Sequence, residues 1–319
     1  MPKTIPHLNL SDYVHGNEEE RQTFSETLGK GLEQFGFLTL GNHGFDRELV
    51  ETCYRHFRTF FALDEPIKDK YDCVTLGARG YTPFGREHAK DSNVPDLKEF
   101  YHVGQELLED HPLFPVYPQN VWPGEVAELR EPTLQLFRKL EQCATTLLYA
   151  LAEYYELPRT TFADMITAGN SVLRVIHYPP LQPGMPNNAL RAAPHEDINF
   201  LTLLIESQGD GLEILSRDRE WIPVSALSGD IIVDSGDMLS RLTNGVIPAT
   251  THRVVNPKDG ANVSRYSMPF FVHPYPTCDL SVMDRFITTD RPAQWPAITA
   301  GEFLEERLRA IGMREDSDD

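Results

Sequence analysis

The most informative stretch of this chain is Pro194-His195-Glu196-Asp197-Ile198-Asn199-Phe200, which leads into the apolar run 200–205. An apolar run of this length indicates a buried strand. Residues two apart in an extended strand point to the same face, so His195 and Asp197 can bind one metal ion from one side. The sequence therefore predicts a pair of metal ligands next to a buried strand.

A second histidine and an arginine lie downstream in two more strand-like segments. His252 lies in the β-branched segment 249–255, and Arg265 begins the apolar segment 265–272. Two imidazoles and one carboxylate leave coordination positions open, which suits non-haem Fe(II) that must bind oxygen and a co-substrate. Ser267 is two residues after Arg265, and a guanidinium beside a hydroxyl can bind a carboxylate. The pattern favours an iron site with an organic acid anchored beside it.

Each of these residues also has a simpler interpretation. A His-x-Asp tripeptide can be a hydrogen-bonded turn, because about one is expected by chance in a chain with 11 histidines. His252 alone would usually be a core histidine, and Arg265 alone could form a surface ion pair. A guanidinium inside an apolar strand is buried, however, and a buried charge needs a counter-ion. The order of these residues along the chain favours the metal and anion sites.

Further segments follow the order found in one enzyme family. They are 5–10, 36–44, 96–101, 177–180, 195–197, 211–214, 252–254 and 265–267. Across about residues 4 to 275, the chain resembles the isopenicillin N synthase-like branch of the Fe(II)/2-oxoglutarate-dependent oxygenases. The resemblance implies a double-stranded β-helix, or jelly roll, with helices packed on its outside.

The resemblance also implies the reaction and the metal ligands. Fe(II) would be bound by His195, Asp197 and His252, and the enzyme would use O2 and the co-substrate 2-oxoglutarate. Hydroxylation of an unactivated C–H bond in a small metabolite, with release of succinate and CO2, is the default expectation. Desaturation and ring closure are variants of the same chemistry.

The co-substrate site implied by the resemblance has three members. The distal carboxylate of 2-oxoglutarate would pair with Arg265, assisted by Ser267 and the hydroxyl of Tyr178. Tyr178 could instead be an aromatic side chain packed on a sheet. Many relatives carry an amide two residues before this tyrosine, where this chain has Ile176. We therefore expect fewer contacts to the co-substrate than in those relatives.

Candidate substrate contacts follow from the resemblance and from strand alternation. The segment after 96–99 is expected to form a strand across the pocket mouth, with alternate side chains facing inward. Side chains that could contact substrate are Tyr101, Val103, Asn199, Phe270, Phe271 and the loop cation Arg86. Each of them could equally be ordinary packing. His177 and His43 are expected to be structural.

The chain has two regions of different pattern. Residues from about 18 to 164 are mainly helical, with one amphipathic helix ending at Gly36 and a long one beginning near Pro132. Short β-rich segments with turn residues between them predict a sandwich or barrel. The expected strands are 172–178, 200–205, 212–215, 231–233, 250–255 and 266–272, and a last helix is expected at 301–311.

We therefore predict a mixed α/β (α+β) fold in a single oxygenase domain, residues 1–319. It would comprise a mainly helical part at about 1–165, a jelly-roll core at about 171–275 and an acidic tail at 315–319 that is expected to be disordered. The sequence shows no internal repeat and no low-complexity linker that would divide the chain.

Composition limits the partners. The formal net charge is −19 at pH 7, and phosphate binding needs clustered Lys and Arg, so no nucleic-acid partner is expected. The four cysteines lie far apart without a C-x-x-C pair, which indicates reduced thiols. Without a membrane-length apolar run or a signal-peptide core, the protein is expected to be cytoplasmic and not to bind a membrane. The oligomeric state is left open.

Three functions fit these observations. The first is a 2-oxoglutarate-dependent oxygenase acting on a small molecule. The second is an iron oxidase without 2-oxoglutarate, like isopenicillin N synthase and the plant ethylene-forming oxidase, which retain the same Arg-x-Ser. Succinate production would separate these two. The third is a jelly-roll protein that binds a metal or a small acid without turnover, which an oxygen-consumption assay would exclude.

Overall fold

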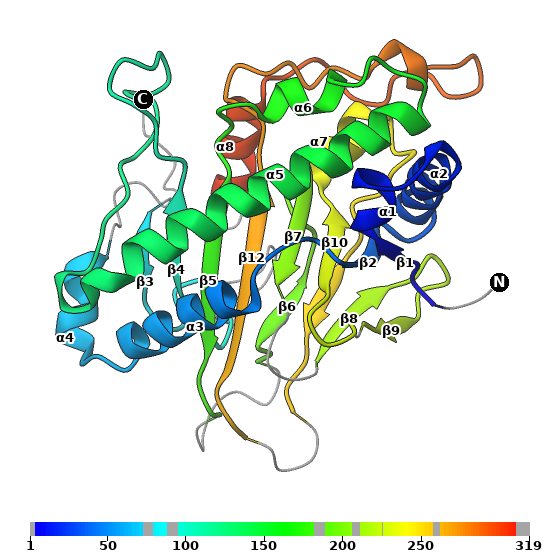
Figure 1. Cartoon of the computed structure of the whole chain (residues 1–319). Coiled ribbons are helices and arrows are strands. Elements are labelled where there is room, and N and C mark those ends of the chain that lie inside the picture. The colour runs from blue at the N-terminus through cyan, green and yellow to red at the C-terminus, as the bar shows by residue number, and fades with distance from the viewer. Residues whose placement is uncertain are drawn as a thin grey trace.

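The computed structural model of the chain describes residues 4–72, 79–87, 95–181, 189–205, 211–224, 226–257 and 262–310. Within these residues, a large and a small β-sheet pack face to face, and helices cover the outer face of the large sheet (Figure 1). Phe37 and Ile232 from the large sheet pack against Ala192, Ile214 and Val254 from the small one. Two facing sheets with this packing form the jelly roll.

The large sheet has eight strands in the order β1-β2-β10-β7-β12-β5-β4-β3. The pair β1–β2 is parallel and the other pairs are antiparallel. Its strands are β1 (His7–Asn9), β2 (Phe37–Gly41), β3 (Gly80–Thr82), β4 (Glu99–Gly104), β5 (Val172–Tyr178), β7 (Leu201–Ile205), β10 (Ile231–Ser235) and β12 (Arg265–Val272). The mainly helical N-terminal part thus also contributes strands to both edges of this sheet.

The small sheet has four strands in the order β6-β11-β8-β9. Its strands are β6 (Ala192–His195), β8 (Leu212–Leu215), β9 (Trp221–Pro223) and β11 (His252–Val254). The two strands β6 and β11 pair antiparallel. The end of β6 and the start of β11 lie opposite each other and carry His195 and His252, two of the predicted metal ligands.

The helices lie mainly on the outer face of the large sheet, where α5 crosses β5, β12 and β7 (Figure 1). No helix of the described residues is long and apolar enough to span a membrane. The helices are α1 (Leu10–Val14), α2 (Glu18–Phe35), α3 (Arg47–Phe61), α4 (Glu65–Lys68), α5 (Arg130–Tyr154), α6 (Thr161–Ile166), α7 (Asp237–Leu242) and α8 (Ala300–Ala310).

Helix α2 begins and ends at residues that stabilise a helix N-terminus and a helix C-terminus. The Asn17 side chain accepts from the backbone of Glu20, and the Glu20 carboxylate accepts from the backbone of Asn17, a capping box. The helix ends at Gly36, whose φ of 64° lies in the left-handed region that glycine adopts without strain. The chain therefore turns directly from α2 into β2, beside β10.

The predicted elements agree with the structure in type and differ in their ends. The strands predicted at 172–178 and 212–215 have those bounds, whereas 250–255 is reduced to the three residues of β11. The strand expected after 96–99 is β4, whereas β1, β2, β3, β6 and β9 were not predicted. Residue 311 and the acidic tail 315–319 lie outside the described residues.

The described cysteines are free thiols: Cys53, Cys143 and Cys278. Burial raises the pKa of Cys53 and of Cys143 to about 12, so both thiols stay protonated and unreactive. Cys73 lies outside the described residues.

Candidate active site

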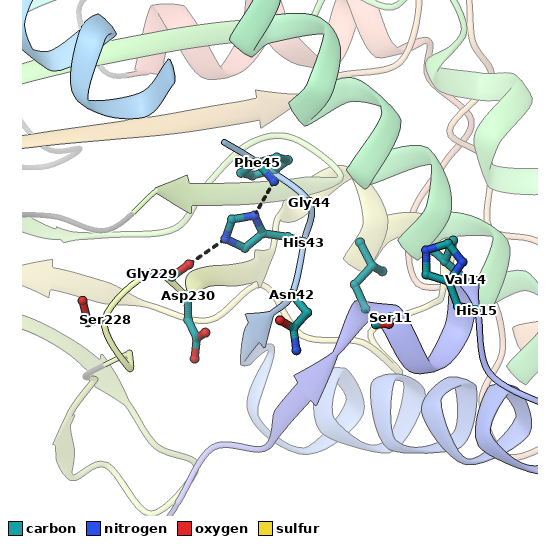
Figure 2. A pocket seen from close by; sticks show the side chains of 11 residues that line it. Ser11, Val14, His15, Asn42, His43, Gly44, Phe45, Ser228, Gly229 and Asp230 are labelled. Carbon is teal, nitrogen blue, oxygen red and sulfur yellow. Dashed lines mark hydrogen bonds between the residues drawn. The ribbon is translucent and has the colours of Figure 1, made fainter. Parts of the chain in front are cut away.

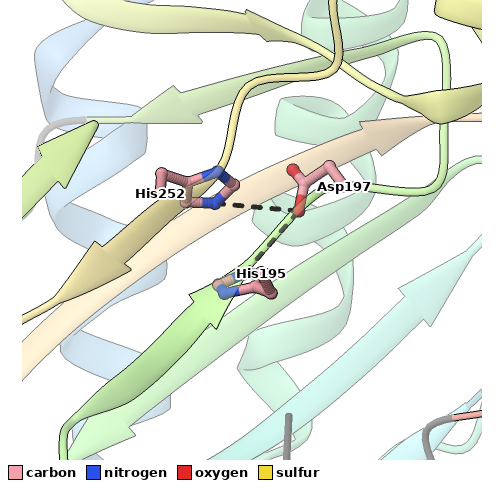
Figure 3. A group of neighbouring side chains, drawn as sticks. All are labelled: His195, Asp197 and His252. Carbon is pink, nitrogen blue, oxygen red and sulfur yellow. Dashed lines mark ion pairs between the residues drawn. The ribbon is translucent and has the colours of Figure 1, made fainter. Parts of the chain in front are cut away.

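The predicted metal ligands meet at one point between the sheets (Figure 3). His195 ends β6 and His252 begins β11, directly opposite each other in the paired strands, with ring centroids 4.3 Å apart. Each histidine Nε2 lies 3.8 Å from Oδ1 of Asp197. Three potential ligand atoms therefore lie within 4.8 Å of one another, close enough for one ion to contact all three.

Both imidazole rings are oriented by backbone carbonyls. His195 Nδ1 lies 2.7 Å from the Ala193 carbonyl oxygen, and His252 Nδ1 lies 3.1 Å from that of Thr250. A carbonyl only accepts, so each Nδ1 carries the proton and donates it, and each Nε2 keeps its lone pair. This is the tautomer that a metal ligand needs, and it is held by groups behind the ligands.

The third ligand is oriented by a threonine. The Thr202 hydroxyl donates to Oδ2 of Asp197, which leaves Oδ1 directed toward the two histidines. The side-chain amide of Asn199 donates to the Thr202 oxygen at 2.9 Å and to the Leu201 carbonyl at 3.1 Å. Asn199 is fully buried. The structure therefore places this predicted substrate contact behind the carboxylate, as a support for Thr202.

The surroundings of the site favour the neutral form of His252 and the uncharged form of Asp234. Burial, and then the neighbouring His195, lower the pKa of His252 to about 4, so the ring is a neutral donor at physiological pH. Burial, and then the charge of Asp197, raise the pKa of Asp234 well above its usual value. Asp234 on β10 is therefore favoured in its protonated form.

The predicted carboxylate site also assembles. Arg265 and Ser267 on β12 are each 2% exposed and lie on the face of the large sheet that is turned toward the small one. Tyr178 on β5 is the cross-strand partner of Arg265, and the guanidinium carbon lies 5.0 Å from its ring centroid. Tyr266 lies between Arg265 and Ser267 in sequence but on the outer face, where its ring stacks on that of His177 with the centroids 4.5 Å apart.

Tyr101 and Val103 lie on the outer face of β4, away from this site. The Tyr101 ring packs at 5.0 Å from Phe60 and at 5.8 Å from Phe57, both on helix α3. The alternation of β4 instead turns Phe100 toward the interior, where it belongs to one apolar cluster with Ile176 and Tyr178. The two residues are therefore core side chains in this structure, and we do not retain them as substrate contacts.

The other substrate candidates separate in the same way. Phe270 lies on the outer face, with its ring edge-on to Phe137 of α5 at 4.9 Å. Phe271 lies on the interior face, with the guanidinium carbon of Arg174 5.2 Å from its ring centroid. Arg86 forms a two-pronged ion pair with Asp72 at 2.6 and 2.7 Å. Phe271 alone among these three faces the interior.

Sequence reasoning missed several interior polar residues. Thr202 and Asp234 support or adjoin Asp197 from β7 and β10. Arg174 on β5 donates to His102 at 2.6 Å and to Glu87 at 3.2 Å. A charged residue inside the apolar segment 172–178 was an available signal for Arg174, whereas nothing in the sequence marked the other two.

A separate hollow of about 680 Å³ lies between α1, the loop after β2 and the segment before β10 (Figure 2). Its lining includes His43, whose Nε2 donates to the Gly229 carbonyl at 2.7 Å while its Nδ1 accepts from the Phe45 backbone at 3.1 Å. Both ring nitrogens are thus used to hold loops together. His43 has the structural role expected for it, and the hollow contains none of the metal-site residues.

Comparison with known proteins identifies the class. Residues 5–125 match the family model described as non-haem dioxygenase in morphine synthesis N-terminal, and residues 169–274 match that of the 2OG-Fe(II) oxygenase superfamily. A 2-oxoglutarate-Fe(II) type oxidoreductase from Aspergillus fumigatus is 27% identical, over 98% of this chain and 95% of that protein.

Two solved structures show the same architecture. A protein described as a 2OG-Fe(II) oxygenase family member from Caulobacter crescentus is 37% identical, with a TM-score of 0.87, covering 97% of this chain and 100% of that one. Neurospora crassa T7H, in complex with alpha-KG (2-oxoglutarate) and thymine, is 25% identical with a TM-score of 0.85 over 96% of each chain.

The chain belongs to the 2OG-Fe(II) oxygenase superfamily. It is an oxygenase that depends on Fe(II) and 2-oxoglutarate, so the first of the three functions considered is confirmed, together with the jelly-roll fold and both cofactors. The two imidazoles and one carboxylate fit Fe(II), because they leave open the positions that O2 and the co-substrate require.

Proposed function

We propose that His195, Asp197 and His252 bind the iron of this oxygenase. The observation that carries the proposal is the orientation of the three donors. Both Nδ1 atoms and one carboxylate oxygen are already used by groups behind the site, so the remaining donor atoms all face one point. Such outer contacts fix the ligand tautomer and ring direction before the metal binds.

The distal carboxylate of 2-oxoglutarate is assigned to Arg265, Ser267 and Tyr178. A buried guanidinium and two hydroxyl groups provide charge and hydrogen-bond donors on one patch of the interior face. When bound, iron and 2-oxoglutarate together supply the oxidising power, since O2 is reduced while 2-oxoglutarate is oxidised to succinate and CO2. The protein's part is to orient the co-substrate and to keep the site shielded from water.

The primary substrate is assigned to the small molecules. Among the described residues, the interior surface beside the iron site carries the half-buried ring of Phe271 next to the cationic Arg174. This combination suits a small ligand with a flat or apolar face and a hydrogen-bond acceptor. The Neurospora crassa relative solved with thymine supports a substrate of that size. Hydroxylation is the outcome we assign, with succinate as the co-product.

An anaerobic titration tests the site assignment. Fe(II) protein titrated with 2-oxoglutarate should develop the weak visible charge-transfer band of the chelate. Asp197→Ala should abolish iron binding, whereas Glu196→Ala, its sequence neighbour outside the ligand set, should retain it. Arg265→Ala should weaken 2-oxoglutarate binding strongly because a desolvated charge pair is lost. Arg86→Ala, which removes an exposed cation, serves as its control.

Each result has a definite meaning. Iron binding that survives Asp197→Ala would overturn the ligand assignment. A normal titration with Arg265→Ala would assign that arginine to the primary substrate instead. Succinate release coupled to oxygen consumption, in the presence of a substrate, then measures turnover directly.

A further inference from the structure

Three cationic side chains surround Tyr178 at the co-substrate end of the site. Arg265 is its cross-strand partner on β12, and Lys98 immediately precedes β4, next to Tyr178 in the continued β4–β5 register. Arg191 immediately precedes β6 and comes from the opposite, smaller sheet. Its Nη2 donates to the Val263 carbonyl at 2.8 Å, two residues before Arg265. Arg191 therefore binds the chain two residues before Arg265, and the charge of Arg265 acts on it.

The charge of Lys98 is already balanced. Its Nζ lies 2.6 Å from a carboxylate oxygen of Glu87 and 2.9 Å from one of Asp96, and all three side chains are buried. A second anion at Lys98 would have to compete with two carboxylates in place. Lys98 is therefore a structural cation, and it does not explain how the site receives a further negative charge.

Arg191 is in the opposite situation. It is 4% exposed, and within the described part of the chain its Nε has no hydrogen-bond partner and its guanidinium forms no ion pair with an acidic side chain. Burial, and then the charge of Arg265, lower the pKa of Arg191. Asn256 accepts from the Arg191 backbone at 3.1 Å, so the residue is held in place by its main chain. A buried guanidinium near another cation is stabilised by an anion that contacts it.

We propose that Arg191 is a second cationic contact for the distal carboxylate of 2-oxoglutarate, opposite Arg265. The proposal rests on the assignment of that carboxylate to Arg265. A carboxylate has about four lone-pair positions, so Arg265 and Ser267 can occupy one side while Arg191 binds the other. Ile176, the interior neighbour of Tyr178 on β5, offers no polar group, so Arg191 adds a donor to the one that the Tyr178 hydroxyl provides. The co-substrate thereby links the two sheets.

The test uses two 2-oxo acids that differ only at the distal end. 2-Oxopentanoate chelates iron through the same keto acid group as 2-oxoglutarate but ends in a methyl group. Their dissociation constants are measured anaerobically from the charge-transfer band of the Fe(II) protein. In Arg191→Gln, 2-oxoglutarate binding should weaken about 10- to 100-fold, as expected for loss of one charge-assisted hydrogen bond. The affinity for 2-oxopentanoate should stay unchanged, and Arg191→Lys should restore part of the loss.

Equal weakening of both ligands in Arg191→Gln would overturn the proposal, because a structural role affects the keto acid group as well. A second variant keeps the test valid if Arg191→Gln does not fold. Arg265→Ala should still prefer 2-oxoglutarate over 2-oxopentanoate, since one cation remains, and loss of all preference would also overturn the proposal. If Arg265→Ala binds both ligands like the unchanged protein, the carboxylate assignment itself fails, and this result is distinct from a failure of Arg191.

Discussion

The hydroxyl of Thr202 selects which oxygen of Asp197 faces the metal site. It donates to Oδ2, and its own oxygen accepts from Asn199, so its proton has one direction to point. Without that bond, the carboxylate could rotate about its Cβ–Cγ bond and would have to be ordered when the metal binds. A residue that touches neither iron nor substrate therefore contributes to metal affinity.

Thr202→Val should weaken Fe(II) binding about 10- to 100-fold, the usual cost of losing a partner behind a metal ligand. The shape of the side chain is kept, so the fold and the affinity for 2-oxo acids of the iron-loaded protein should change little. Thr202→Ser, which keeps the hydroxyl, is the control and should bind iron normally. The measurement is competition for Fe(II) with a chelator, and equal affinities of the Val and Ser variants would contradict the argument.

Residues whose partners lie close to them in sequence could be predicted. Residues whose partners lie on another strand or on the opposite sheet could not. His195, Asp197 and Arg265 were recognisable because each lies two residues from a partner or next to an apolar strand. Arg191 and Asp234 carry no such signal. Their roles depend on which strands lie next to or opposite one another in the folded protein, and this packing cannot be read from the sequence.

The same limit applies to strand faces. Alternation correctly separates neighbouring side chains, but it does not say which of the two faces is the interior. For β4, each face carries one ionisable side chain among the others, Glu99 on one face and His102 on the other, and every position from Glu99 to Gly104 is buried. Tyr101 was therefore predicted on the interior, whereas helix α3 covers its face. The two faces of this strand resemble each other in polarity and in burial, so the sequence offers no basis for the choice.

Gly36 joins helix α2 to strand β2 and lies against Thr250, two residues before His252. A Cβ at this position would clash with Oγ1 of Thr250, whose hydroxyl donates to the Phe35 carbonyl. Backbone strain alone should lower the free energy of unfolding of Gly36→Ala by about 1–3 kcal/mol. The clash with Thr250 should lower it further. The substitution should also weaken iron binding, because the backbone carbonyl of Thr250 accepts the hydrogen bond from Nδ1 of His252.

The control for Gly36→Ala is Gly44→Ala. Gly44 also has a positive φ, of 78°, but a Cβ there would meet nothing within 4 Å, so only the backbone strain applies. Denaturant unfolding compares the two variants, and iron titration follows. If Gly44→Ala is as destabilising as Gly36→Ala, the contact with Thr250 does not matter and the strain alone explains both.

At the scale of the whole molecule, the two segments matched by separate family models share one sheet. Strands β1 to β4, within residues 5–125, border strands from residues 169–274 on both edges of the large sheet. The pairs β2–β10 and β4–β5 join residues far apart in sequence, and short strands such as β9 give little local signal. Sequence patterns therefore predicted the jelly-roll class and its helices better than the pairing of strands across the chain.

Acid should destabilise the molecule through a buried histidine beside the iron site. His273 follows β12, and burial lowers its pKa to about 4, while in the unfolded chain a histidine titrates near 6.5. As the pH falls from 6.5 to 4, the unfolded state binds a proton that the folded state does not. The contribution of His273 to stability is therefore fully present above pH 6.5 and is lost as the pH falls toward 4. The loss is about 2 kcal/mol at pH 5.

The contribution of His273 can be isolated from other groups with His273→Gln. Asp237, whose pKa is raised to about 6 mainly by burial, acts in the opposite direction, since its protonation stabilises the fold as the pH falls below 6. Both proteins share that effect, so the informative quantity is the difference between their unfolding free energies. Measured by denaturant unfolding of chelator-treated protein, the advantage of the unchanged protein over His273→Gln should shrink by about 2 kcal/mol between pH 7.5 and pH 5. A difference that stays constant across this range would mean that His273 takes up its proton in the folded state as readily as in the unfolded chain.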